Sequence, residues 1–123
     1  MPRVVHFEVN ADKPDRAIKF YQGVFGWKIE KWPGPIEYWT ITTGDDKSMG
    51  INGGLTKRRE SKFATVNYIG VPALDEYVAK VKKMGGQILQ PKTEVMGIGF
   101  IAVCQDTEGN IFGIIEPKMA QPK

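Results

Sequence analysis

The sequence predicts an α+β fold built from two βαβββ modules in tandem. The first observation behind this prediction is an internal repeat, because residues 9–27 can be laid over residues 69–87 at a constant offset of about 60 residues. The second is that each copy carries apolar residues at the i, i+3, i+4, i+7 spacing of a helix with one buried face. The third is a pair of short apolar runs, joined by polar turns that contain glycine, which follows each strand–helix–strand unit.

The first module begins with an apolar strand at residues 4–9. Asp12 and Pro14 then favour a helix start, because the Asp12 carboxylate can accept a free backbone N–H and proline tolerates the first turn. The helix is expected to end at Gly26, before a strand at residues 27–32. Two further strands are predicted at residues 38–43 and 49–55.

The second module repeats this order from a strand at residues 65–71. Its helix begins after Pro72 without a preceding Ser, Thr, Asp or Asn, so a weaker N-terminal cap is expected. The helix should end at Gly85, before a strand at residues 87–90. The last two strands are predicted at residues 99–105 and 111–116. They should form a hairpin, because Gly109 in the turn between them can adopt the positive φ that such a turn needs.

Length and composition predict one domain over residues 1–123, with module one at about 1–56 and module two at about 63–117. Hydrophobic residues make up 41% and charged residues 25%, which is ordinary for a soluble globular protein, and the apolar runs are too short to span a membrane. The N-terminal residues show no signal region, so a cytoplasmic protein is expected. The formal charge of +3 includes the basic triplet at residues 57–59. Since no aromatic residues alternate with it, we expect solvated surface rather than a nucleic-acid site.

The single cysteine, Cys104, lies within an apolar run and is expected to be a buried thiol rather than a reactive one. No intrachain disulfide can form. A structural zinc site is excluded in the same way, because the chain has one histidine.

Three segments resemble a known family: HFEVNADKPDRAIKFY at residues 6–21, VFGW at 24–27 and DTEGNIFG at 106–113. They are similar to the opening and the closing hairpin of the glyoxalase, bleomycin-resistance and extradiol-dioxygenase superfamily, also called vicinal oxygen chelate proteins. The resemblance implies that each module is a curved mixed sheet with its helix on the convex face, and that the concave faces enclose a pocket. It also implies a homodimer and a small-molecule ligand or substrate.

In the metal-using members, the resemblance implies ligands from the first and last strands of each module. His6 matches the first of these positions, but Val66 stands at the equivalent position of module two. The last-strand positions fall at residues 52–54, where the family's carboxylate is absent, and at Gly113, where metal-binding members carry Glu. Because catalytic sites normally need about three protein ligands, no cofactor is expected, and a divalent metal would have His6 only.

His6 and Glu8 are the candidate catalytic residues, because alternate residues of a strand share a face. An imidazole with a reference pKa near 6.5 beside a carboxylate suits proton transfer near neutral pH. The alternative is a hydrogen-bonded pair without turnover. The residues expected to bind the ligand are Tyr38, Thr40, Asn52, Tyr68 and Gly113. Of the neighbours Tyr38 and Trp39, alternation permits only one to face the pocket, and we expect it to be Tyr38.

Two functions follow from these residues and from the resemblance. The first is a metal-independent, glyoxalase-like protein that acts on a small oxygenated molecule by proton transfer, as a lyase or isomerase. The alternative is a protein of the bleomycin-resistance type that binds or sequesters a small ligand without turnover. A structural dimer without a ligand is a third interpretation. A partner nucleic acid or membrane is not expected, and the sequence does not name the substrate.

Overall fold

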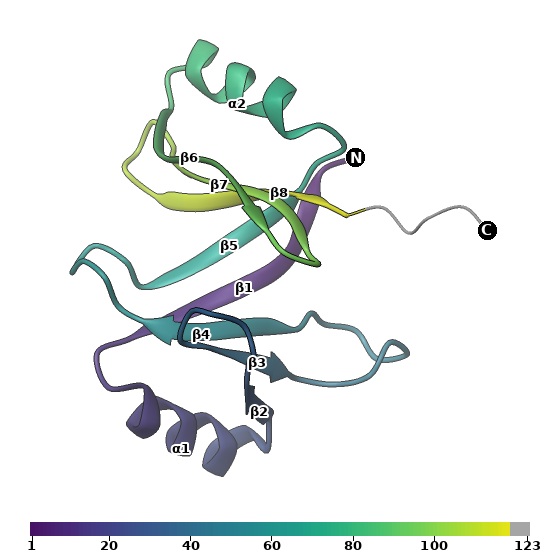
Figure 1. Ribbon diagram of the computed structural model, residues 1–123, viewed down its shortest axis with the longest axis vertical. Coiled ribbons are helices and arrows are strands. Elements are labelled where there is room, and N and C mark those ends of the chain that lie inside the picture. Colours follow the sequence, from purple (N-terminus) through teal and green to yellow (C-terminus); the bar gives the residue numbers. More distant parts are fainter. Residues whose placement is uncertain (119–123) are drawn as a thin grey trace. The chain divides into compact units, whose positions relative to one another are not determined.

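The computed structural model describes residues 1–118 and consists of two compact units. One unit, called here the first module, comprises residues 5–66. The other, called the second module, comprises residues 1–4 and the chain from Asn67 onward. The order of elements is strand, helix and three strands, used twice, which confirms the predicted α+β fold of two βαβββ modules (Figure 1).

The first module is a four-stranded sheet with one helix. Its strands lie in the order β2-β3-β4-β1, with β2, β3 and β4 antiparallel and β1 parallel to β4. The bounds of its elements are β1 (Arg3–Ala11), α1 (Pro14–Phe25), β2 (Lys28–Lys31), β3 (Tyr38–Thr42) and β4 (Gly53–Lys57).

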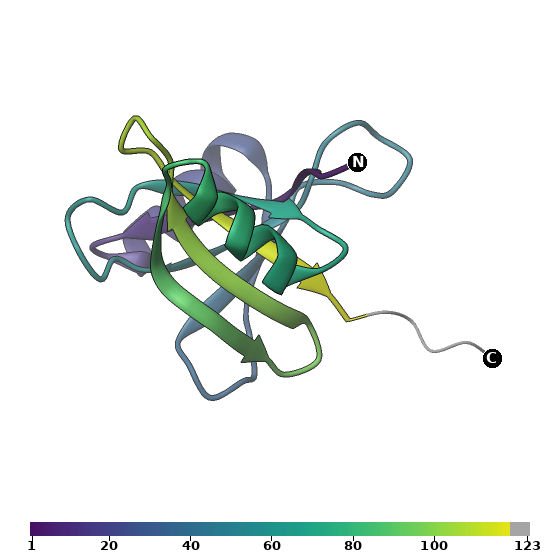
Figure 2. The same cartoon turned by 90° about the horizontal axis from the view of Figure 1, so that it is seen from above.

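The second module has the same topology. Its strands lie in the order β5-β8-β7-β6, with β5 parallel to β8 and the other pairs antiparallel. Figure 2 shows α2 lying over one face of this module's sheet. The bounds are β5 (Thr65–Gly70), α2 (Leu74–Lys83), β6 (Gln87–Val95), β7 (Gly99–Gln105) and β8 (Ile111–Pro117).

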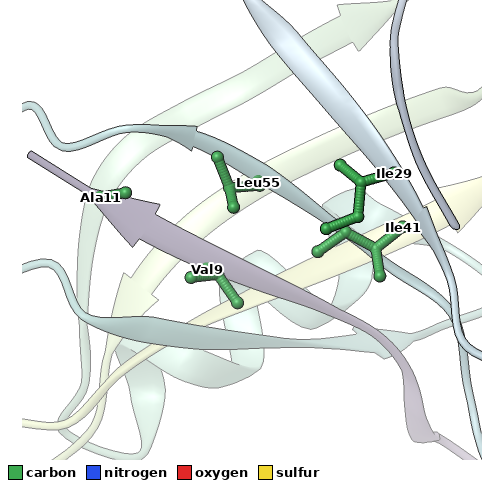
Figure 3. Close-up of a cluster of buried hydrophobic side chains, with 5 residues drawn as sticks. All are labelled: Val9, Ala11, Ile29, Ile41 and Leu55. Atoms are coloured by element: carbon green, nitrogen blue, oxygen red, sulfur yellow. The ribbon is translucent and has the colours of Figure 1, made fainter. Parts of the chain in front are cut away.

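Each module has its own core between the helix and one face of the sheet. In the first module the buried side chains are Val9, Ala11, Ile29, Ile41 and Leu55 (Figure 3). Apolar residues of α1 at helical spacing, among them Ile18 and Tyr21, pack against this cluster. In the second module the corresponding cluster is Val71, Leu74, Ala102, Cys104 and Ile114. Cys104 is fully buried, as predicted, and burial raises the pKa of its thiol to about 11.

The start of α1 differs from the prediction. Lys13 is the N-cap residue and no side chain accepts a hydrogen bond there, so the expected cap by Asp12 is wrong. Asp12 instead forms an ion pair with Arg58, with 2.8 Å between Oδ1 and Nε. Pro14 lies in the first turn as predicted, and α1 ends at Gly26, whose φ of 71° is left-handed.

The start of α2 is capped from a distant strand. The backbone N–H of Leu74 donates to Oε1 of Glu116 in β8, at 2.8 Å. This carboxylate supplies the acceptor that the sequence before α2 lacks, at the end of the helix that favours negative charge. Glu116 therefore lies on the helix side of its sheet, with Ile114.

Three strand or surface assignments also need correction. β4 begins at Gly53 rather than at residue 49, because the preceding residues belong to a loop. In this loop the Thr43 backbone N–H donates to Oδ1 of Asn52, and the Thr43 hydroxyl donates to the carbonyl of Ile51. β6 continues to Val95, past shifts in its pairing with β7. Arg58 is not simply solvated surface, since besides pairing with Asp12 its guanidinium donates to the Phe63 carbonyl. The hairpin before β8 is as predicted, with Gly109 at a φ of 87°.

Neither α1 nor α2, the helices of residues 1–118, has the length and apolar character that crossing a membrane would require.

Candidate functional site

The candidate catalytic residues lie on the sheet face of the first module that is turned away from α1. Along β1, Phe7, Val9 and Ala11 pack into the helix-covered core. Since neighbouring residues of a strand point to opposite faces, His6 and Glu8 share the other face. Both side chains are half-buried. The structure thus brings the two residues onto one surface, as the alternation predicts.

Tyr38 in β3 reaches the same surface and meets His6. The Tyr38 hydroxyl oxygen lies 3.0 Å from His6 Nε2, which is hydrogen-bonding distance. Its neighbour Trp39 packs into the core beside α1. Tyr38 rather than Trp39 therefore shares the face of His6, and its expected contact with a ligand stays a prediction. No sequence pattern indicated the contact between Tyr38 and His6.

Gly54 in β4 makes room for this contact. It lies opposite Glu8 of β1 and opposite Thr40 of β3 in the pairing of the strands. A Cβ atom built on Gly54 would lie 1.7 Å from the Tyr38 hydroxyl oxygen, a distance that no real contact permits. The absence of a side chain at residue 54 is therefore a condition for the observed position of Tyr38.

Burial shifts the two titratable groups of this face in opposite directions. It lowers the pKa of His6, because the charged imidazolium loses hydration. It raises the pKa of Glu8 for the same reason, and the positive charge of Arg59 opposes that rise. At neutral pH His6 is consequently a neutral imidazole, the form that can accept a proton.

Asn10 continues the same face of β1 beyond Glu8 and was not predicted. It is only 6% exposed, and its side-chain Nδ2 donates to the Ala64 carbonyl at 2.9 Å. Its backbone N–H donates to the same carbonyl at 3.0 Å. Asn10 Oδ1 is buried without a hydrogen-bond partner among residues 1–118. Alternation from His6 and Glu8 was the signal that could have identified Asn10.

Aromatic and hydroxyl groups extend the surface away from β1. The Trp32 ring meets the Tyr38 ring edge to face, with 6.2 Å between the centroids. Thr40 shares the Tyr38 face of β3, is exposed, and donates from Oγ1 to the Glu30 carbonyl at 3.3 Å. Together these groups give the face an apolar aromatic part beside a polar part, a combination that suits a small ligand.

The remaining predicted ligand-binding residues belong to a loop of the first module and to the second module. Asn52 belongs to the loop at residues 43–52, where its Oδ1 accepts the Thr43 backbone N–H at 2.8 Å. This loop forms a hollow of about 290 Å³ that His6 does not line. Tyr68 and Gly113 are buried neighbours in the second module, paired between β5 and β8. The structure groups His6, Glu8, Tyr38 and Thr40 on one face of the first module's sheet, and Asn52 lies at the end of the loop that leads into β4.

Residues 3–114 match the family described as the Glyoxalase/Bleomycin resistance protein/Dioxygenase superfamily. The chain belongs to this superfamily. The resemblance inferred from the sequence is thereby confirmed. Among curated proteins, this superfamily member is 28% identical over 117 residues to "Putative glyoxylase CFP32" from Mycobacterium bovis and to the protein of the same name from Mycobacterium tuberculosis. The match covers 93% of this chain but 44% of each relative, so the chain spans less than half their length.

Solved structures share the superfamily fold at low sequence identity. Hypothetical protein BH1468 from Bacillus halodurans has a TM-score of 0.70 at 15% identity, with 99% of both chains covered. Streptomyces coelicolor methylmalonyl-CoA epimerase in complex with 2-nitronate-propionyl-CoA has a TM-score of 0.69 at 14% identity, with 98% of both chains covered. The Mycobacterium tuberculosis epimerase also scores 0.69, at 13% identity, covering 94% of this chain and 88% of its own. At these identities the likeness shows the fold alone.

The residues of this superfamily member do not fit a metal site of the expected type. Residues 1–118 contain no group of three His, Cys, Asp or Glu side chains placed to hold an ion. Within residues 52–54 the register singles out Gly54, because it pairs with Glu8 of β1 as Gly113 pairs with Tyr68 of β5. A tyrosine fills the side-chain space of both glycines. Tyr38 fills it at Gly54, and Tyr68 fills it at Gly113, where a Cβ would lie 2.3 Å from two carbons of the Tyr68 ring. A carboxylate ligand at either position would require the tyrosine to move.

Proposed function

We propose that the chain binds a small oxygenated molecule on the His6 face of the first module, and that His6 and Glu8 transfer a proton there without a metal ion. The observation that carries this proposal is the half-buried imidazole of His6, which shares one sheet face with a carboxylate and a tyrosine hydroxyl. Burial lowers the pKa of this imidazole. General acid/base catalysis needs such a group within reach of the ligand and with a pKa near the working pH.

The lowered pKa of His6 favours this role, and the charge of Arg59 limits the rise that burial causes in the pKa of Glu8. A neutral His6 can accept a proton from the bound molecule, and the imidazolium that forms is stabilised by a nearby carboxylate charge. Glu8 lies two residues from His6 on the same face and supplies that charge when it is ionised. Arg59 favours the ionised form of Glu8. The reaction class that this arrangement suits is a lyase or isomerase step, in which a proton leaves one atom and returns to the same or another atom of the ligand.

A second function is ligand binding without turnover, as in proteins of the bleomycin-resistance type. The edge-to-face pair of Trp32 and Tyr38 favours this alternative, because it presents an aromatic surface to a flat or cationic compound. Binding alone would need no proton transfer, and His6 and Glu8 would then serve as hydrogen-bonding groups.

The test starts with a thermal-shift screen of tag-free, chelator-treated protein against small oxygenated and aromatic compounds. A ligand of the native state raises the apparent stability by mass action. Each stabilising compound is then incubated with the protein in D2O and followed by proton NMR for loss of a C–H signal or appearance of a product. Wild type is compared with His6→Ala and Glu8→Gln.

Turnover by wild type that is lost in folded His6→Ala would support the catalytic proposal. Turnover that persists in His6→Ala would remove His6 from the mechanism. Stabilisation without exchange or product would favour the binding function. A parallel titration with nickel, zinc, manganese and iron(II) tests the metal-free part, because stabilisation of wild type but not His6→Ala would show an ion at His6 and overturn it.

A further inference from the structure

The His6–Tyr38 contact engages one defined nitrogen of the imidazole. Of the two imidazole nitrogens, Nε2 lies 3.0 Å from the Tyr38 hydroxyl oxygen. That hydroxyl rests in the space above Gly54, where even a methyl group would displace it. The bare backbone of Gly54 in β4 thus allows Tyr38 of β3 to place its hydroxyl at Nε2 of His6.

The chemistry of the two groups decides which one donates. A phenol, with a reference pKa near 10, is a good hydrogen-bond donor, and a neutral imidazole nitrogen, with a reference pKa near 6.5, is a better acceptor than a phenol oxygen. Burial disfavours the imidazolium, in which both nitrogens would carry hydrogen and neither could accept. A hydrogen bond from Tyr38 to Nε2 leaves the ring hydrogen on Nδ1, because the partner of one nitrogen sets the state of the other.

We propose that Tyr38 is a positioning residue for His6: its hydroxyl donates to Nε2, holds the imidazole as the Nδ1–H tautomer, and takes the place at Nε2 that a metal ion would need. The inference rests on the proposed role of the His6 face, and it adds a residue that directs how His6 presents its two nitrogens. Because Nδ1 already carries hydrogen, a bound molecule must displace the Tyr38 hydroxyl from Nε2 before His6 can accept its proton. It also gives Gly54 a function, since the glycine admits the hydroxyl that orients the ring.

The proposal can be tested on the ligand-free protein, because His6 is the only histidine of the chain. Protein labelled with ¹⁵N at histidine gives one pair of imidazole nitrogen signals, and their shifts at neutral pH distinguish the two tautomers. Wild type is compared with Tyr38→Phe, which keeps the ring and removes the hydroxyl, and with Gly54→Ala, which displaces the hydroxyl without removing it. Gly23→Ala in α1 is the matched control, since nothing lies within 4 Å of the added methyl group.

We expect wild type and Gly23→Ala to show Nε2 as an unprotonated acceptor and Nδ1 as the protonated nitrogen. Tyr38→Phe should shift both signals toward the values of a mixture of tautomers, and Gly54→Ala should do the same. An Nε2–H tautomer in wild type, or signals unchanged in Tyr38→Phe, would overturn the proposal. If Gly54→Ala does not fold, the comparison with Tyr38→Phe still decides.

Zinc ions, added to the same samples, test the competition at Nε2. An ion must break the Tyr38 hydrogen bond in wild type but not in Tyr38→Phe. The His6 signals of Tyr38→Phe should therefore respond at a zinc concentration lower by roughly fivefold, the factor expected for one ordinary hydrogen bond. Equal sensitivity would refute the competition. These readouts use no ligand, so an inactive protein with the expected tautomer would contradict the proposed function and leave the role of Tyr38 intact.

Discussion

The packing of Tyr68 over Gly113 yields a quantitative prediction about the position where metal-using relatives are expected to carry a carboxylate. In Gly113→Ala, the new methyl carbon would lie 2.3 Å from the nearest Tyr68 ring carbons, so the ring or the strand must shift. Overpacking of this kind costs about 1 to 3 kcal/mol. The smaller conformational entropy of alanine in the unfolded chain returns about 0.4 to 1 kcal/mol. We expect a net loss of about 1 to 2 kcal/mol in the free energy of unfolding.

Thermal denaturation followed by circular dichroism measures this loss. With an unfolding entropy of about 2.1 cal/mol/K per residue over 123 residues, the expected decrease in Tm is about 4 to 8 °C. Gly23→Ala, where the added methyl group meets no atom, should keep or raise the Tm.

A double-mutant cycle attributes the loss to the ring. In a Tyr68→Leu background the ring is absent, so Gly113→Ala should cost less by about 1 kcal/mol than it does in wild type. The reasoning would be refuted if Gly113→Ala were as harmless as Gly23→Ala, or if its cost were the same with and without the Tyr68 ring. Either result would mean that residue 113 can carry a side chain beside Tyr68.

Three further predictions concern the start of α2, the thiol of Cys104 and the imidazole of His6. Glu116→Ala should lower the free energy of unfolding by about 1 to 2 kcal/mol, because the Leu74 N–H loses a charged acceptor; equal denaturation midpoints for Glu116→Ala and the exposed-site control Glu94→Ala would contradict this. Cys104 should resist alkylation in the folded protein near neutral pH, because burial raises its pKa to about 11; rapid labelling detected by mass spectrometry would show that the thiol is accessible. Wild type should lose stability relative to His6→Gln as the pH falls below about 6.5, because burial lowers the pKa of His6 and the unfolded chain then binds more protons than the native state. If the difference in unfolding free energy between the two proteins does not change between about pH 7.5 and 5, that reasoning is refuted.

Local sequence signals predicted most of the fold. The position of α1 was predicted from the helical spacing of its apolar residues, from Pro14 at its start and from Gly26 at its end. Each of these signals depends only on the local backbone or on residues one turn away. The same holds for Gly109 in the last hairpin. The offset between the two copies added the topology, since duplicated units repeat the order of their elements.

The predictions that were wrong or incomplete concern side chains whose partners lie far away in the sequence. Asp12 had the chemistry of a helix cap, but Arg58, 46 residues away, pairs with it. Alternation placed His6 and Glu8 on one face, whereas the contact of His6 with Tyr38 depends on strand pairing across 32 residues and on the bare backbone of Gly54. A periodic pattern gives the face of a strand, but it does not give the partner of a side chain.

The cap of α2 has a consequence for protein synthesis. Leu74 precedes Glu116 by 42 residues, so the ribosome completes the helical segment long before the residue that caps it emerges. A ten-residue helix is too short to be stable in water on its own. The last strand therefore supplies both the sheet partner of β5 and the acceptor for the first turn of α2. During translation the second module cannot complete its sheet or cap α2 until β8 has been synthesised. A nascent chain released before Glu116 would leave α2 without its cap.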